Sequence, residues 1–327
     1  MLIAVNYHYV RPVFDAPHPG IHGITPTQFE SQLMLLTSAG SFVSAAQIRA
    51  ALRGDRALPD RALVVTFDDG LREQFEHAWP VLERLGIPAV FFANTQPIAD
   101  ATVSSVHKIH LLRANLPVAE FGSQLAEAAA RQSIQLDFEA VTAAAVEHYK
   151  YDEPEAARVK YVLNFALTES QRQSLMDRMF DVVFPAAEAE ISRRLYMDRV
   201  QLRTLAQRGM IGTHGHSHLP LGMLSEPDAD EQIRQSVDLL TDWTDRRPFA
   251  LSYPYGSREA SSPSVAQAAT RRGIEFAFTM ERAGNHDLRS PLHLARFDNN
   301  DLPGGKASRW SIEELFDKVG SRSWHTT

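Results

Sequence analysis

The stretch ALVVTFDDG (residues 62–70) places two adjacent carboxylates, Asp68 and Asp69, between an apolar run and a glycine. The apolar run is typical of a buried strand, so both aspartates fall where that strand ends. Charges at such a position are costly unless they are solvated or used in chemistry. Two interpretations follow: an Asp-Asp-Gly turn that ends the strand, or a pair in which one carboxylate ligates a metal and the other faces a water bound to it.

Similar apolar runs recur along the chain, separated by segments of helical spacing. Strands are predicted at 2–10, 62–69, 89–95, 210–214, 249–256 and 276–280. Helices are predicted at 25–40, 71–86, 228–243 and 263–273, with Thr25 or Thr27 as the N-cap of the first. This alternation predicts an α/β fold with a mainly parallel sheet, open or closed into a barrel.

Residues 100–195 interrupt the alternation. They are rich in Ala, Glu, Gln and Arg and show helical spacing over 120–133, 138–150 and 170–180. We therefore expect one domain over 1–327 that carries a helical insertion over 100–195.

The composition limits the classes of function. The chain has 327 residues, 44% hydrophobic and 22% charged, and no apolar stretch approaches the ~20 residues of a membrane span. A net charge of -7 gives no electrostatic reason to bind nucleic acid, and no pattern indicates an oligomeric state. Without cysteine, any metal would need nitrogen and oxygen ligands. The N-terminus MLIAVNYHYV makes a poor signal peptide, so we expect a cytoplasmic protein.

The segment IGTHGHSH (211–218) contains three histidines at every second position: His214, His216 and His218. An extended backbone would put all three on one face, whereas a turn would separate them. A lone histidine is often a structural hydrogen-bonding group, but three within five residues at the end of a strand favour a metal site. Neutral imidazoles with one carboxylate and an open position for water form a common hydrolytic zinc arrangement, and Asp69 can supply the carboxylate.

Three motifs occur in order, each at the end of a predicted strand: TFDDG (66–70), HGHSH (214–218) and SYPYG (252–256). Together they resemble the polysaccharide deacetylase family, also called the NodB-homology or carbohydrate esterase family 4 fold. The resemblance covers about 1–98 and 196–300. It implies a distorted (β/α) barrel that removes N-acyl groups from amino sugars with a divalent metal, for which we expect Zn²⁺.

The resemblance implies roles for residues in the first two motifs. Asp68 corresponds to the catalytic base, and Asp69 corresponds to a metal ligand. The outer histidines of the second motif, His214 and His218, correspond to the other two ligands. His216 falls on a variable middle position.

The third motif departs from the family pattern. The backbone N–H of its tyrosine, here Tyr255, would help to stabilise the oxyanion. The family usually has an arginine that holds the base aspartate at the position of Ser252. Arg296, just after a predicted strand region in HLARFD (293–298), could take this role; a surface or salt-bridging arginine is the alternative.

The general acid is the second departure. Most members use a late Leu-x-His motif with no clean match here, where His286 and His293 are the late candidates. The segment VNYHYV (5–10) resembles the N-terminus of a permuted branch that includes the poly-N-acetylglucosamine deacetylases, in which this histidine is the acid. His8 would then protonate the departing amine; a hydrogen-bonding histidine at the end of a strand is the alternative.

Two further segments outside the motifs contain two histidines each. His18 and His22 belong to a glycine-containing loop over 18–26 that could fold over a ligand. His107 and His110 are spaced i, i+3 and would share a helix face, either as a second metal or sugar-phosphate contact or as packing or solvent-facing residues.

The motifs together predict a metal-dependent carbohydrate N-deacylase, either a deacetylase or a deformylase. Without an export signal, the expected substrate is a nucleotide-linked or lipid-linked amino-sugar precursor of a surface polysaccharide. A finished polymer is one alternative, and a hydrolase of a different amide or ester is another. A non-catalytic carbohydrate-binding protein on the same fold is the third, although Asp68 is a carboxylate that such a protein does not need.

Overall fold

The computed structural model describes residues 1–15, 21, 23–149 and 153–325. The chain folds into two compact units. The first unit comprises Met1–Pro12, Gly23–Thr102 and Ser192–Thr327, and the second comprises Val13–His22 and Val103–Ile191.

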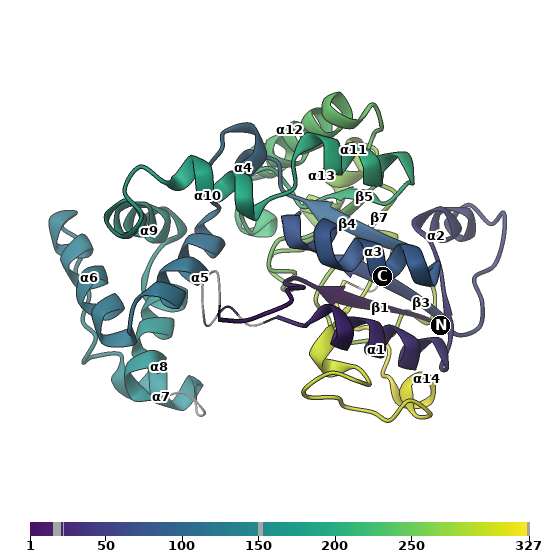
Figure 1. Ribbon diagram of the computed structural model, residues 1–327, viewed down its shortest axis with the longest axis horizontal. Helices are drawn as coiled ribbons and strands as arrows, with labels where there is room; N and C mark the ends of the chain where they lie inside the picture. The colour runs from purple at the N-terminus through teal and green to yellow at the C-terminus, as the bar shows by residue number, and fades with distance from the viewer. Residues whose placement is uncertain (16–20, 22, 150–152, 326–327) are drawn as a thin grey trace. The chain divides into compact units, whose positions relative to one another are not determined.

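The first unit is built on a parallel sheet of eight strands (Figure 1). The strands are β1 (Leu2–Tyr7), β2 (Ser41–Phe42), β3 (Ala62–Phe67), β4 (Ala89–Ala93), β5 (Ile211–Thr213), β6 (Ala250–Ser252), β7 (Phe276–Phe278) and β8 (Phe297–Asp298). Their order is β7-β6-β5-β4-β3-β1-β8, and β2 pairs with β3. Phe278 of β7 also bridges to Leu294, just before β8. Backbone pairing therefore continues around the sheet, and the predicted distorted (β/α) barrel is confirmed.

The six predicted strands are present, and each is shorter than the sequence indicates. The sequence missed β2 and β8, because two-residue strands carry no periodic signal. The strand region expected before Arg296 is wrong in position, since β8 begins directly after that residue.

Helices cover the sheet, and α11, α12 and α13 gather near β5 and β7 in Figure 1. The helices of this unit are α1 (Pro26–Thr37), α2 (Ala45–Leu52), α3 (Trp79–Leu85), α4 (Gln96–Ala99), α11 (Arg199–Gln207), α12 (Glu226–Thr244), α13 (Pro263–Arg271) and α14 (Leu315–Lys318). Three short 3₁₀ turns, η3 (Leu221–Met223), η4 (Pro291–His293) and η5 (Asn299–Asp301), accompany them. Thr25 is the N-cap of α1, with a capping box to Gln28. The helix predicted at 71–86 divides into a π-helix, η1 (Gln74–Ala78), and α3, because Pro80 has no N–H to continue the α-helical ladder.

Alternate strand residues form two apolar layers. Inside the barrel lie Ala4, Val64, Phe92 and Phe278, among others. The opposite face packs under helices, with residues such as Val5, Val65 and Phe91 against Phe29 and Leu33 of α1. Strands buried on both faces are expected in a parallel sheet covered by helices.

The second unit is helical. Its elements are α5 (Ser105–Asn115), α6 (Val118–Arg131), α7 (Thr142–His148), α8 (Pro154–Tyr161), the π-helix η2 (Val162–Ala166) and α9 (Glu169–Val183); α10 (Glu188–Leu195) follows. All lie within the segment predicted as a helical insertion. The buried ammonium of Lys108 donates to Asp177 at 2.6 Å and pairs with Glu188 at 2.8 Å, which joins α5, α9 and α10. Among the described residues, no helix has both the length and the apolar character needed to cross a membrane.

Candidate metal and catalytic site

The inward-facing positions change from apolar to polar at the carboxyl edge of the sheet. Asn6 continues the face of Ala4 on β1, and Asp68 continues the face of Val64 beyond β3. Because parallel strands end at the same edge, polar side chains that are distant in sequence meet there. This edge is where barrels of parallel strands carry their sites.

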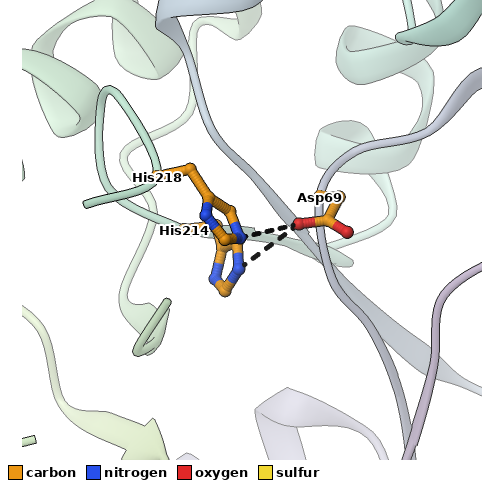
Figure 2. A group of neighbouring side chains, drawn as sticks. All are labelled: Asp69, His214 and His218. Carbon is orange, nitrogen blue, oxygen red and sulfur yellow. Dashed lines mark ion pairs between the residues drawn. The ribbon is translucent and has the colours of Figure 1, made fainter. Parts of the chain in front are cut away.

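Asp69, His214 and His218 come together at this edge (Figure 2). Their ligand atoms lie within 4.8 Å of one another, and all three residues are buried. The Nε2 atoms of His218 and His214 lie 3.2 and 3.6 Å from Asp69 Oδ1. His216 is outside this group, since its Nδ1 is 2.9 Å from Thr95 Oγ1 and its ring ties the loop after β5 to the loop after β4.

The state of His214 shows that these donors suit a cation. Its Nδ1–H donates to the Ser252 carbonyl oxygen at 2.8 Å, so its Nε2 carries a lone pair toward Asp69. Burial lowers the pKa of His214 to about 4, against the opposing effect of Asp68 and Asp69, so the ring is neutral at pH 7. A lone pair that faces a carboxylate is repulsive unless a cation lies between them. Two imidazoles and one carboxylate therefore fit a divalent metal such as Zn²⁺, with a coordination position left for solvent.

Three residues at this site have a strained backbone. Asp69, His218 and Tyr255 have φ angles of 77°, 57° and 63°, in the left-handed region that residues with a Cβ avoid. Each such residue costs of the order of 1 kcal/mol or more and persists only where its surroundings enforce it. Gly70, with φ of 65°, continues the turn after Asp69, and a Cβ there would lie 2.9 Å from the Ala93 Cβ. Two of the predicted ligands and the predicted oxyanion residue thus have backbone conformations that their surroundings must enforce.

Arg296 holds Asp68 in a buried ion pair. Its Nη1 and Nη2 donate to the two Asp68 carboxylate oxygens at 2.9 and 2.7 Å. Burial alone would raise the pKa of Asp68, but the Arg296 guanidinium, with the nearby His214, outweighs it and the pKa falls to about 2. Arg296 therefore lies where the predicted orienting role requires it, and it is no surface arginine.

Three residues that the sequence analysis did not assign to this pair complete it. Asn6 Nδ2 donates to Asp68 at 3.0 Å, and Asn6 Oδ1 accepts from Arg296 at 3.0 Å. Arg296 also donates to Thr66 Oγ1 at 3.1 Å and to Ser252 Oγ at 2.8 Å. Asn6 and Thr66 are polar residues at inward-facing positions of strands that are otherwise apolar. This pattern in the sequence could have indicated their part in the site.

His8 follows β1 directly and is half-buried. Gln74 connects this segment to that of Asp68. Its buried side-chain amide donates to the His8 carbonyl at 3.0 Å and to the Asp68 carbonyl at 2.6 Å. The candidate acid and the candidate base are therefore held together through their main chains.

Tyr255 lies at the edge of the ligand group, whereas the two late histidines lie away from it. The Tyr255 ring lies 5.1 Å from the His218 ring and is 43% exposed, at the edge of the ligand group. His293 is buried elsewhere, where its Nε2–H donates to the Ser261 carbonyl at 2.9 Å, and His286 is exposed. Neither late histidine therefore takes the position of a general acid.

The predicted pair His107 and His110 does not belong to the ligand group among the described residues. His107 is buried in the second unit and hydrogen-bonds Ser104 Oγ at 2.8 Å, with the His110 ring 5.8 Å away. These contacts fit the packing interpretation. His18 and His22 lie outside the described residues.

Known proteins are similar to this chain in sequence. Residues 55–134 and 176–277 match the sequence profile of the family described as polysaccharide deacetylase. A stretch of 90 residues is 33% identical to the poly-beta-1,6-N-acetyl-D-glucosamine N-deacetylase of Escherichia coli strain K12, and it spans 27% of this chain and 13% of that relative.

Solved structures share the fold at low sequence identity. A deacetylase, PplD, from Streptococcus pyogenes is 14% identical with a TM-score of 0.58, over 97% of both chains. IcaB from Ammonifex degensii is 17% identical with a TM-score of 0.53, over 90% of both chains. The profile match takes in more than half of the sequence and includes the first two motifs. The chain therefore belongs to the polysaccharide deacetylase family.

Proposed function

We propose that this protein hydrolyses the N-acetyl group of N-acetylglucosamine units in a glycan, with a divalent cation held by Asp69, His214 and His218. The observation that carries this proposal is the buried pair of Asp68 and Arg296 beside the ligand group. An ionised carboxylate fixed beside a metal site can take a proton from water, as a general base must. We therefore favour catalysis over the binding alternative.

The proposed reaction divides its work among four residues. A bound cation would supply Lewis-acid polarisation of the amide carbonyl and make water more acidic. Asp68 takes a proton from the water that attacks the acyl carbon, while Arg296 keeps this carboxylate ionised and oriented. The Tyr255 backbone N–H donates to the oxygen on which negative charge develops. His8 gives a proton to the leaving nitrogen, so that acetate and a free amine result.

The substrate class is the finer part of the proposal. We favour a polymer because the Escherichia coli relative is named for poly-beta-1,6-N-acetyl-D-glucosamine. A nucleotide-linked or lipid-linked precursor, which would fit a cytoplasmic protein, presents the same N-acyl amino sugar and stays the second candidate. The acyl group removed is either acetyl or formyl. The reacting groups act on the carbonyl and not on its substituent, so the same reaction would remove both.

An assay of acetate and formate release separates these candidates. The metal-loaded protein is incubated with β-1,6-linked N-acetylglucosamine oligomers and with free and nucleotide-linked N-acetyl and N-formyl amino sugars. Acetate from the oligomers alone supports the polymer, and release from a nucleotide-linked sugar alone supports the precursor. No release from any substrate would overturn the proposed function.

Asp68→Asn tests the role of the base. We expect a loss of about 10²–10⁴-fold in kcat, the usual contribution of a general base, with metal content nearly unchanged. His214→Ala is the matched comparison and should lose metal and turnover together, because it removes a ligand. Normal turnover in Asp68→Asn would show that another group is the base.

A further inference from the structure

Asn94, the residue that follows β4, has a buried side-chain amide. It has no exposed surface, and neither its Nδ2 nor its Oδ1 has a hydrogen-bond partner among the described residues. Buried carboxamides in native proteins are nearly always hydrogen-bonded, and one that is not calls for a specific explanation.

Strand alternation directs Asn94 into the barrel. Phe92, two residues earlier, belongs to the apolar cluster inside the barrel and is in register with Gly212 of β5. The pairing continues past the strand, since His214 N donates to the Ala93 carbonyl at 2.9 Å. Asn94 is therefore on the inward face with Phe92 and level with His214 on the neighbouring strand.

Asn94 is thus the contribution of β4 to the polar layer that ends the barrel interior. In this layer β3 supplies Asp68, β5 supplies His214 and β6 supplies Ser252. Each of these three has a hydrogen-bond partner, namely Arg296 for Asp68, the Ser252 carbonyl for His214 and Arg296 for the Ser252 hydroxyl. Since β4 lies between β3 and β5, Asn94 stands between the strand that leads to Asp68 and Asp69 and the strand that leads to the two histidines.

We propose that Asn94 is a positioning residue that orients the attacking water, an inference that rests on the proposed hydrolytic function. A water that attacks a carbonyl directs its oxygen at the acyl carbon and has two hydrogens to place. Asp68 accepts the hydrogen that is transferred, and Asn94 Oδ1 accepts the other. A neutral amide does this without placing a further negative charge beside Asp68 and Asp69.

The test compares two buried carboxamides. Asn94→Leu removes the amide at a similar volume, and because no protein hydrogen bond is lost, the metal-free variant should unfold at the same or a higher urea concentration than wild type. In the Zn²⁺-loaded protein, kcat should fall at least tenfold with KM within about threefold, as is usual when a residue that supports a metal centre is removed. The visible spectrum of the Co²⁺-substituted protein, which reports the ligands of the ion, should also change.

Gln32→Leu is the control. Gln32 is a buried carboxamide with three partners, the Tyr7 hydroxyl and the carbonyls of Asn299 and Pro303. Its loss should lower the urea midpoint and leave both kcat and the Co²⁺ spectrum unchanged.

Two results would overturn the proposal: a kcat of Asn94→Leu within twofold of wild type, or a loss of metal-free stability as large as that of Gln32→Leu. If the wild-type protein turns over no substrate, the proposed function fails by itself and the Co²⁺ spectra decide the role of Asn94. A spectrum that changes in Asn94→Leu and not in Gln32→Leu supports the contact with water, and unchanged spectra in both overturn it.

Discussion

Asp68 keeps its charge inside the barrel because one guanidinium meets both of its oxygens. That guanidinium belongs to Arg296, and it also donates to Ser252, the residue that stands where the family motif has an arginine. A serine at this position leaves room for an arginine from elsewhere and accepts a hydrogen bond from it. The departure from the motif and the arginine before β8 are therefore parts of one arrangement.

Arg296→Met should leave Asp68 as an unpaired buried charge. We expect a loss of about 3–5 kcal/mol in the free energy of unfolding at pH 7, together with a large fall in kcat. The pKa of Asp68 should rise from about 2, so the loss should shrink as the pH falls and the carboxyl becomes protonated. Urea unfolding at pH 7 and pH 4 measures the loss of stability and its dependence on pH.

Ser252→Ala is the matched control for this prediction. It removes one hydrogen bond to Arg296 and leaves the ion pair intact, which should cost about 1 kcal/mol. Equal losses in the two variants would contradict the view that the unpaired charge dominates.

At the scale of elements, the segment that begins η1 supports the site. Gln74, the first residue of η1, donates to the main chain of His8 and of Asp68. The preceding residue, Glu73, is half-buried, and loss of solvation raises its pKa to about 7 although Arg11 Nε lies 3.3 Å away and opposes the rise. The Glu73 carboxyl is therefore largely protonated below pH 7.

Glu73→Gln should flatten the dependence of stability on pH. The folded-state pKa of about 7 lies above the ordinary 4.5, so the folded protein binds more protons than the unfolded chain between these values. Wild-type stability should therefore fall as the pH rises from about 5 to 8, by about 2–3 kcal/mol from this group. In Glu73→Gln this contribution should be absent, and urea unfolding at both pH values measures it. A decline of the same size in both proteins would mean that Glu73 ionises normally in the folded state.

At the scale of the whole molecule, the ligand group draws on two strands of the sheet. Asp69 follows β3, and His214 and His218 follow β5, with β4 between them. A cation bound by all three links segments that are about 145 residues apart in the sequence. The metal should therefore stabilise the fold as well as serve the chemistry.

Removal of the metal should lower the melting temperature of the wild-type protein. At a free metal concentration of a thousand times Kd, binding adds about 4 kcal/mol to the free energy of unfolding, and a chelator removes this contribution. Thermal unfolding with and without chelator measures the shift. His218→Ala, which lacks one ligand, should show little response to the chelator, and a full response in this variant would contradict the predicted ligand set.

The sequence by itself determined the fold class, and it predicted which residues would bind a metal. Periodicity located six of the eight strands, because a buried strand must be apolar along its length. The resemblance of two short motifs to a known family predicted Asp69, His214 and His218 as the ligands. The structure brings these three residues together.

Only the tertiary structure decided how the base is held. Arg296 and Asn6 are 228 and 62 residues from Asp68, and β8 is too short to leave a periodic pattern. The unpartnered state of Asn94 could not be read from the chain either, because an asparagine after a strand is an ordinary turn residue until its neighbours are known. A hydrogen bond between distant residues depends on strand register and barrel closure, and these arise from the packing of the whole sheet rather than from any local run of sequence.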